Sequence, residues 1–343
     1  MQAFSDNHAP DLPRERLILF VVYPGIKLLD IAGPLQVFVD TKSLFENAVT
    51  YRTCLASLSG GPVKTDTMAE LGTVALVDFS GVEIDTLLVC GGPGVHAAAE
   101  NTELTKRIRQ LASQARRFGS VCTGAFLLGN SGLLDGKRVT THWEACDRLA
   151  RQFPGAVVES DPIFVNDGRA WSSAGVTAGI DLALAMVASD YGRKIALEVA
   201  RSLVAFMVRP GQQSQFSSAL ALQISDADGR FGRLHDWIFA HVAEDLSVEM
   251  LARQVNMELR TFHRQYYAIT GMSPAKAVET IRMEAALRLI EEPAISLSQV
   301  ALRCGFKNQE RFRRAFIRAT GTAPDDYRKG LRTPSYVDTH EAA

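Results

Sequence analysis

The sequence has few cysteines and no long apolar run, and each absence removes a class of protein. The cysteines are an odd number, widely spread and without a CxxC pair, which argues against a disulfide framework and a zinc site. No apolar run reaches the roughly 18 residues of a membrane span. Residues 1–15 are polar where a signal peptide would be apolar, and we interpret them as a disordered lead. We therefore expect a cytoplasmic protein with no membrane association, metal or cofactor. The five cysteines are Cys54, Cys90, Cys122, Cys146 and Cys304.

The net charge of −1 conceals two parts of opposite charge. Residues 230–332 hold 17 Lys and Arg against 12 Asp and Glu, a net charge of +5. The remainder holds 20 against 26, a net charge of −6. A basic segment attached to an acidic one suggests a polyanionic partner for the basic segment alone.

The first two hundred residues alternate short apolar runs with segments of helical pattern. This order predicts a mostly parallel sheet covered on both faces by helices, a doubly wound α/β fold. Asn166-Asp167-Gly168 is a hairpin turn signal between residues 163–165 and 170–172, and one long helix is expected from about Thr177 to Met207. The expected strands are 17–22, 86–90 and 120–122, and the expected helices lie at about 30–40, 103–117, 123–132 and 142–152.

A stretch rich in Gly, Ser and Gln begins near Pro210 and reaches about Gly229. We interpret residues 208–229 as a linker between two domains, the first of which covers residues 16–207. The second domain, residues 230–332, has a helical pattern throughout, and residues 333–343 form a polar tail that we expect to be disordered.

The strongest signal is a near-repeat within the basic segment. LSVEMLARQVNMELRTFHRQYYAITGMSP (Leu246–Pro274) is followed by ISLSQVALRCGFKNQERFRRAFIRATGTAP (Ile295–Pro324). Matched residues lie 49 positions apart in the first half of the repeat and 50 apart in the second, so the second copy has one extra residue. Such repetition predicts two copies of one small helical unit.

Each copy has the parts of a helix-turn-helix unit. Ser296 and Gln299 form a capping box that starts a helix, and Ser247 is expected to cap the corresponding helix of the first copy. Asn256 and Gly305 occupy the turn, and these residue types tolerate the left-handed conformation best. The second helix of each unit is then the one that enters the major groove of DNA.

On these residues, segment 230–332 resembles the AraC/XylS family of regulators. The signature is ALRCGFKNQERFRRAFIRATGTAPDDYRK in the second copy. The resemblance implies two recognition helices held by a rigid helix at about Ala275–Glu291, which is roughly 25 Å long at 1.5 Å per residue. Two readers held apart in this way can occupy successive major grooves on one DNA face, about 34 Å apart.

The resemblance assigns DNA contacts to positions on both recognition helices. Arginine can pair with guanine or phosphate and glutamine with adenine, whereas Glu310 would accept from cytosine or repel the backbone. The alternative, a solvated face of an ordinary helical bundle, is disfavoured by the repeat. The candidate DNA-binding residues are Arg260, His263 and Arg264 in the first unit and Gln309, Glu310, Arg313 and Arg314 in the second.

Cys122 lies between a short apolar strand and a helical run, with small residues on either side. This pattern is typical of a sharp strand-to-helix turn such as a nucleophile elbow. A thiol at the N-terminus of a helix is expected to have a lowered pKa. His142, and Asp30 at the start of the first helix, could complete an activated nucleophile.

With GGPG (Gly91–Gly94), residues 16–207 resemble the class I glutamine amidotransferase-like superfamily in its PfpI branch. Val121–Trp143 resembles the GlxA-type group, in which such a domain precedes an AraC-type one. The resemblance implies a flavodoxin-like fold with Asp30, Cys122 and His142 lining one pocket. The acid is Asp, one methylene shorter than the Glu usual in the related enzymes, so we assign no catalytic residue.

Each candidate also has a structural alternative. Cys122 is a small residue in a tight turn, a ligand-facing thiol without catalysis, or a true nucleophile. His142 starts a helix or lines the pocket. Asp30 caps the first helix or contacts the ligand. Trp143 forms a pocket wall or belongs to the core.

Together these patterns indicate a one-component transcriptional regulator. A small metabolite, expected from the resemblance to be amino-acid or amine-derived, binds near Cys122 and changes how the basic domain engages double-stranded promoter DNA. The resemblance also implies a homodimer, RNA polymerase as a partner, and activation rather than repression. Two alternatives are a thiol-dependent hydrolase or amidase that also binds DNA, and a redox sensor in which Cys122 becomes a sulfenate.

Overall fold

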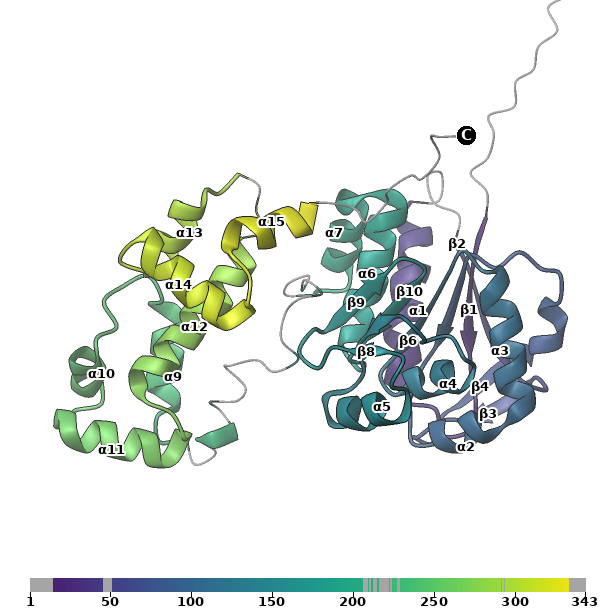
Figure 1. Cartoon of the computed structure of the whole chain (residues 1–343), viewed down its shortest axis with the longest axis horizontal. Coiled ribbons are helices and arrows are strands. Elements are labelled where there is room, and N and C mark those ends of the chain that lie inside the picture. The colour runs from purple at the N-terminus through teal and green to yellow at the C-terminus, as the bar shows by residue number, and fades with distance from the viewer. Residues whose placement is uncertain are drawn as a thin grey trace, which may run out of the picture. The chain divides into compact units, whose positions relative to one another are not determined.

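The computed structural model divides the chain into two compact units, Met1–Gln215 and Phe216–Ala343 (Figure 1). The division falls within the stretch interpreted as a linker. The expected lead, except Glu15, and the expected tail lie outside the described residues. The described residues are 15–45, 51–205, 209, 211, 215, 222, 224–226, 229–290, 292 and 294–332.

The first unit is built on an eight-stranded sheet with the strand order β3-β4-β2-β1-β5-β6-β10-β9. The strands from β4 to β10 pair in parallel, and the antiparallel strands β3 and β9 close the edges. A second, two-stranded sheet joins β7 to β8. The strands are β1 (Arg16–Val21), β2 (Tyr51–Ser57), β3 (Gly61–Lys64), β4 (Glu70–Ala75), β5 (Thr86–Val89), β6 (Arg117–Val121), β7 (Arg138–Val139), β8 (Val157–Val158), β9 (Phe164–Asp167) and β10 (Ala170–Ser173).

Helices cover both faces of the large sheet, which confirms the doubly wound α/β fold. Helices α1, α6 and α7 contact one another, as do α2, α3 and α4, and Figure 1 shows these two groups on opposite faces. The helices are α1 (Leu28–Leu44), η1 (Leu76–Phe79), α2 (Val95–Glu100), α3 (Thr102–Gln114), α4 (Gly124–Asn130), η2 (Trp143–Ala145), α5 (Cys146–Gln152), α6 (Ala178–Tyr191) and α7 (Arg193–Ser202).

Strands buried on both faces were the ones that the sequence revealed. Strand β5 is buried along its whole length and β1 at every residue but the first, so they read as continuous apolar runs. Strand β2 is interrupted by the polar pair Arg52 and Thr53, and β3 and β4 are partly exposed. These strands and the two-residue strands β7 and β8 were not predicted, because none of them forms a continuous apolar run.

Two details of the expected secondary structure are wrong. The single helix expected from Thr177 is broken at Gly192, whose φ of +91° no helix accommodates, and Met207 lies outside the described residues. The hairpin forms as predicted, but Asp167 pairs with Ala170, so the turn is Gly168-Arg169. The glycine carries the turn because its φ is +62°.

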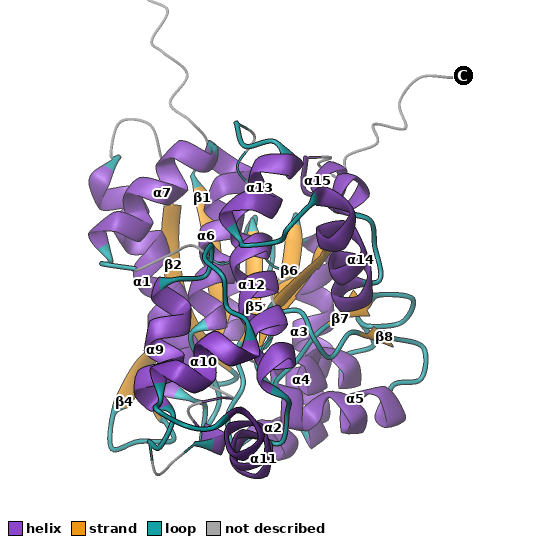
Figure 2. Cartoon of the chain, turned by 90° about the vertical axis from the view of Figure 1, so that its left-hand side faces the viewer, coloured by secondary structure: helices purple, strands orange, loops and turns teal. Residues whose placement is uncertain are grey.

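The second unit consists of helices only over the residues that the structure describes (Figure 2). Its helix α12 contributes Ala277, Val278 and Ile281 to one apolar core and Met283 and Ala286 to another, which its C-cap residue Ile290 also joins. The helical pair α10 and α11 packs on the first core, and the pair α13 and α14 packs on the second. The helices are α9 (Gly232–Ala240), α10 (Val248–Gln254), α11 (Leu259–Thr270), α12 (Pro274–Leu289), α13 (Leu297–Arg303), α14 (Gln309–Thr320) and α15 (Pro324–Arg332).

Helix α12 is the rigid connector that the sequence placed at about 275–291. Its 16 residues span about 24 Å at 1.5 Å per residue. Within the described ranges of the chain, no helix is both long and apolar enough to cross a membrane.

Candidate nucleic-acid interface and ligand site

Both helix-turn-helix units have the predicted left-handed turn residue. Asn256, between α10 and α11, has a φ of +52°, and Gly305, between α13 and α14, has a φ of +73°. A Cβ at Gly305 would lie 2.3 Å from the carbonyl oxygen of Val242, so the second turn has no room for a side chain. The turn residues therefore set the angle at which each recognition helix leaves its partner.

The helix starts differ from expectation in one unit. Ser296 accepts a hydrogen bond from the Gln299 amide (3.2 Å) and its own amide donates to Gln299 Oε1 (2.9 Å), which confirms the capping box. Ser247 is the N-cap residue of α10, but its side chain makes no capping hydrogen bond, so that expectation is wrong. The recognition helices are capped by Glu258 and Asn308, whose side chains accept from the backbone.

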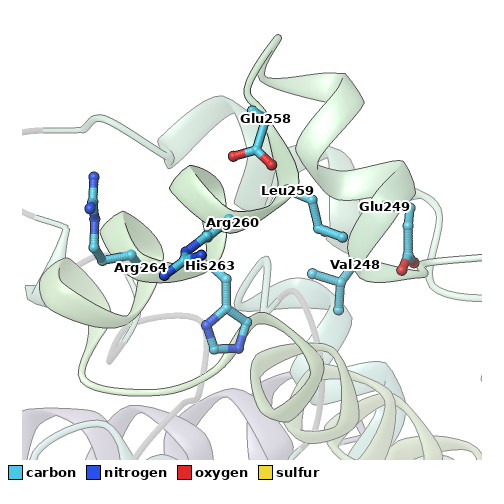
Figure 3. Close-up of a pocket in the computed structure, with 7 residues that line it drawn as sticks. All are labelled: Val248, Glu249, Glu258, Leu259, Arg260, His263 and Arg264. Carbon is cyan, nitrogen blue, oxygen red and sulfur yellow. The ribbon is translucent and has the colours of Figure 1, made fainter.

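Helix α11 presents the three predicted cationic or titratable side chains to solvent. Arg260, His263 and Arg264 are exposed, whereas Phe262 and Tyr266 on the other face are fully buried. The exposed residues line a hollow of about 520 Å³ (Figure 3). The hollow is completed by Val248, Glu249, Glu258 and Leu259.

Helix α14 repeats the arrangement. Phe312 and Phe316 are buried in the second core, and the four predicted residues Gln309, Glu310, Arg313 and Arg314 are exposed. Gln309 Oε1 accepts from the Ser298 hydroxyl (2.8 Å). Glu310 lies 3.4 Å from Arg314 in an ion pair one turn apart on the helix. The charge of Arg314 is therefore partly matched before any partner arrives.

A basic groove of about 480 Å³ lies between the two helix-turn-helix units, and sequence reasoning missed most of it. Arg311, Arg314 and Arg318 line it from α14, at helical spacings of three and four that place them on one face. The same spacing could have identified Arg311 and Arg318 from the sequence. Lys307 and Arg282 add further positive charge, and Glu279 is the acidic residue of the lining.

The two units are fixed to each other through α12. The guanidinium of Arg282 donates to the carbonyls of Val242 (3.1 Å) and Glu244 (2.5 Å), which precede α10. Glu279, also on α12, forms an ion pair with Arg318 of α14 (2.9 Å). These contacts hold the two recognition helices in one rigid arrangement.

In the first unit, the parallel strands bring the N-terminal candidates to one edge of the sheet. Cys122 directly follows β6, the GGPG segment follows β5, and Asp30 lies in the first turn of α1, which follows β1. The carboxyl ends of parallel strands lie at the same edge of a sheet. In a doubly wound sheet, ligands bind at this edge, next to the point where the strand order reverses, which is here between β1 and β5.

Cys122 occupies the sharp turn that the sequence predicted. Its φ is +56°, its amide donates to the Ser173 carbonyl (3.0 Å), and its carbonyl accepts from the Thr141 hydroxyl (2.8 Å). A Cβ at Gly175 would lie 2.1 Å from the Cβ of Cys122, and one at Gly91 would lie 2.9 Å from it. Close packing against Gly175 and Gly91 holds the backbone of Cys122 in this strained left-handed conformation, and so fixes the position of its thiol.

Asp30 is fully buried beside this turn. Its Oδ1 accepts from the amide of Val176 (2.8 Å), whereas Oδ2 has no hydrogen-bond partner among the described residues. Burial raises the pKa of this carboxyl group, although the Val176 amide and next to it the Cys122 thiol act in the opposite direction. A buried acceptor without a donor is uncommon and marks a place where a ligand group can bind.

Residues 16–189 match the DJ-1/PfpI family, and residues 251–330 match a helix-turn-helix domain. The chain belongs to the DJ-1/PfpI family. It is 26% identical to the HTH-type transcriptional regulator GbdR of Pseudomonas aeruginosa, over 94% of this chain and 88% of that protein. It is 30% identical to the HTH-type transcriptional regulator Rv1931c of Mycobacterium tuberculosis, over 75% of this chain and 100% of that protein.

A third relative, the HTH-type transcriptional regulator GlxA of Rhizobium meliloti, is 27% identical over 79% of this chain and 82% of that protein. The predicted combination of a PfpI-type domain with an AraC-type domain is thereby confirmed. Among solved structures, a THiJ/PfpI family protein from Pseudomonas syringae has the same fold, with a TM-score of 0.51 and 23% identity over 79% of this chain and 98% of that one.

The thiol of the DJ-1/PfpI domain does not have the lowered pKa expected from its place before a helix. Burial, and next to it the negative charge of Asp30, raise the pKa of Cys122 to about 12. Hydrogen bonds from Thr123 at the start of α4 act in the opposite direction and are outweighed. The expectation considered only the helix end, and it is wrong because the thiol is buried and because Asp30 of α1 lies beside it.

We predict that Cys122 reacts slowly and that Asp30 is part of the reason. The rate of alkylation by iodoacetamide at Cys122 should rise about tenfold per pH unit up to at least pH 9, because only the thiolate reacts. Asp30→Asn removes the neighbouring charge and should raise the rate at pH 8 by about tenfold, the effect of one pKa unit. Peptide mass spectrometry resolves the site, and a plateau below pH 8 in the unmodified sequence would contradict the prediction.

His142 is not joined to the pair formed by Asp30 and Cys122. Its Nδ1 accepts from the amide of Glu144 (3.4 Å) and so caps η2, and its ring lies 5.6 Å from that of Trp143. The hydrogen bonds and ion pairs of the described residues include none from His142 to either partner. Trp143 is 47% exposed, outside the core. The structure thus brings two of the four candidate residues together.

Proposed function

We propose that the protein is a DNA-binding transcriptional regulator whose DJ-1/PfpI domain binds a small metabolite. The observation that carries this proposal is the pair of helix-turn-helix units with exposed cations on both recognition helices, joined through the rigid helix α12. Two recognition helices held by one such connector, which is about 24 Å long, can enter successive major grooves on one DNA face. The candidate DNA-binding residues remain Arg260, His263, Arg264, Gln309, Glu310, Arg313 and Arg314, and Glu310 acts among them through its ion pair with Arg314.

The effector is expected to bring an N–H or O–H donor to Asp30. Its Oδ2 is buried and lacks a partner in the described part of the chain, and a ligand amine would supply both a donor and a compensating charge. An amino-acid or amine-derived metabolite fits this requirement. Cys122 then contacts the ligand as a neutral thiol, and His142 and Trp143 are candidates for the mouth of the site.

The regulator would bind double-stranded promoter DNA as a homodimer in the cytoplasm. It would act on RNA polymerase as an activator of transcription. A ligand can change DNA binding only if its affinity differs between two states of the protein. Reporter expression from the neighbouring promoter, with and without the gene for this protein, tests the sign of regulation.

The salt dependence of DNA binding tests the proposal directly. With the full chain and a duplex from upstream of its own gene, the logarithm of the affinity should fall linearly with the logarithm of the salt concentration, with a slope of about −0.9 per phosphate contact. Arg311→Ala, in the basic groove, should make this slope shallower by about one contact and weaken all sequences equally.

Lys106→Ala is the matched control, because Lys106 is an exposed cation on α3 of the other unit. It should leave both slope and affinity unchanged. Affinity without any salt dependence, or no affinity for duplexes upstream of this gene and its neighbours, would rule the regulator out.

A thiol enzyme and a redox sensor are the competing functions. Both need Cys122 as a thiolate, and burial together with the Asp30 charge disfavours that form. Turnover of esters, amides or α-oxoaldehydes that is lost in Cys122→Ala would favour the enzyme. DNA binding that responds to peroxide, and no longer does so in Cys122→Ser, would favour the sensor.

A further inference from the structure

Among the described residues of the chain that leaves the DJ-1/PfpI domain, the carbonyl of Gly211 accepts from the amide of Phe164 (3.3 Å). Two side chains also fasten this chain to the domain, and the first is Arg209. Its amide donates to Asp181 Oδ1 (3.0 Å), and its guanidinium donates to Asp181 Oδ2 (2.6 Å) and to the Thr177 hydroxyl (3.0 Å). Asp181 is buried in α6, so this ion pair lies mostly outside the reach of solvent screening. We call these contacts the Arg209 clasp.

The second fastening is Gln215, the last residue of the first unit. Its Nε2 donates to the hydroxyl of Thr140 (3.1 Å) and to the carbonyls of Thr141 (2.9 Å) and Pro162 (3.2 Å). Its amide donates to the carbonyl of Asp161 (2.8 Å). We call these contacts the Gln215 clasp.

Both clasps end on residues that hold the ligand site. Thr141, which accepts from Gln215, donates its hydroxyl to the carbonyl of Cys122. Thr177, which accepts from Arg209, directly follows Val176, whose amide donates to Asp30. Cys122 is thus one hydrogen bond away from the Gln215 clasp, and Asp30 is one hydrogen bond and one residue away from the Arg209 clasp.

The Gln215 clasp is also incomplete. Its Oε1 is buried and has no hydrogen-bond partner among the described residues. An acceptor that loses water without gaining a donor opposes the docking that the three Nε2 contacts favour. The unpartnered acceptor therefore lowers the stability of the closed Gln215 clasp, so that the clasp is sensitive to the position of Thr141.

We propose that these two clasps transmit ligand occupancy at Asp30 and Cys122 to the tether of the DNA-binding unit. The inference rests on the proposed ligand site. With the clasps closed, the last anchored residue is Gln215. With both clasps and the Gly211 contact open, the last anchored residue among those described is Ala205, whose amide donates to the carbonyl of Ala200. A longer tether changes the effective concentration at which two linked binding modules meet their sites.

Hydrogen exchange of the full chain, read at the amides of Arg209 and Gln215, tests the direction from site to clasp. Thr141→Val removes the donor to the Cys122 carbonyl and should speed exchange at Gln215 at least tenfold, whereas Thr141→Ser keeps the hydroxyl and should restore the slow rate. Asp30→Ala should speed exchange at Arg209 to a similar extent. Thr105→Val is the control, since Thr105 is also buried and donates to a backbone carbonyl (3.2 Å), but in α3.

The reverse direction distinguishes coupling from local damage. The side-chain hydrogen bonds of Gln215 within the described residues do not include Cys122. Gln215→Ala should nevertheless raise the rate of iodoacetamide alkylation at Cys122 at least threefold, because coupling between two sites is reciprocal. Gln152→Ala, at an exposed glutamine of α5, should not change it.

The proposed transmission through the clasps would be overturned by unchanged amide exchange rates at Gln215 in Thr141→Val and at Arg209 in Asp30→Ala. An unchanged alkylation rate at Cys122 in Gln215→Ala would also overturn it. Should Asp30→Ala fail to fold, Thr141→Val and the alkylation measurement still decide. Neither measurement uses DNA or an effector. If these tests fail while salt-dependent DNA binding persists, the proposed regulator function stands and only the coupling is lost. If they succeed while DNA binding fails, the regulator function is lost and the coupling stands.

Discussion

Arg264→Ala combined with Arg314→Ala should reduce promoter affinity by about 30-fold to more than 10⁴-fold. Each side chain lies exposed on a recognition helix, and one base contact of this kind is worth about 1–3 kcal/mol. Because the two helices are fixed through α12, neither can move to replace the contact that its partner loses. Fluorescence anisotropy with a labelled duplex at fixed salt measures the loss, and footprinting locates it.

The two single variants should lose different amounts of promoter affinity. Arg314 already pairs with Glu310 at 3.4 Å, so DNA must compete for its charge, and Arg314→Ala should cost less than Arg264→Ala. Glu310→Ala should then strengthen binding by freeing Arg314. Arg201→Ala, at an exposed cation that also has an acidic partner one turn away, is the control in the other unit. Unchanged affinity and footprint in both arginine variants would refute the docking.

Asp190→Ala should destabilise the DJ-1/PfpI domain by about 3–5 kcal/mol, the usual effect of leaving one charge of a buried pair alone. Asp190 and Arg117 are 1% and 3% exposed at the side chain and lie 2.6 Å apart. Asp190 also accepts from the Tyr51 hydroxyl (2.6 Å) and pairs with Arg116 (2.7 Å). The substitution removes the acceptor at the centre of this network, where α6 meets the ends of three strands.

Urea unfolding, followed by circular dichroism and by scanning calorimetry to separate the two units, measures this loss. A domain of about 200 residues should melt roughly 6–20 °C lower, at about 2–4 °C per kcal/mol. Glu198→Ala removes an acid from an exposed ion pair with Arg201 and should change stability by less than about 1 kcal/mol. A shift in Asp190→Ala no larger than that of this control would show that the network is not stabilising.

The same network should lose stability in acid. Burial acts to raise the pKa of Asp85, but hydrogen bonds from Arg116 and Thr86 outweigh it and lower the pKa to about 2. Because the folded pKa is depressed, the contribution is fully present above about pH 4, where the unfolded group is ionised, and is lost as the pH falls towards 2. Arg116→Met should flatten this part of the stability profile.

The sequence was most informative about features that depend on residues adjacent along the chain. The left-handed residues Asn256 and Gly305, the cap at Ser296 and the sharp turn at Cys122 all follow from short stretches of chain, and all were found. Ser247 shows the limit of such rules, since the same residue type at the same position makes no cap. Whether a hydroxyl turns towards the helix depends on its surroundings, which the local pattern does not contain.

The candidate ligand site depends on contacts between distant parts of the chain. No pattern in the sequence places the amide of Val176 on Asp30, or the side chain of Gln215 on Thr141. His142 appeared to be the third member of a triad because of its residue type, yet its ring caps a helix instead. Residue types can be read from a sequence, but their orientations cannot.

By itself, the sequence determined that this protein has a doubly wound domain followed by two helix-turn-helix units, because periodicity, turn residues and repetition are properties of adjacent positions. The tertiary structure alone decided that the pKa of the Cys122 thiol is raised rather than lowered, and that the departing chain is hydrogen-bonded to residues beside Cys122. Electrostatics and hydrogen bonding act through space, and the fold brings Asp30, Thr141 and Gln215 to Cys122 from different segments.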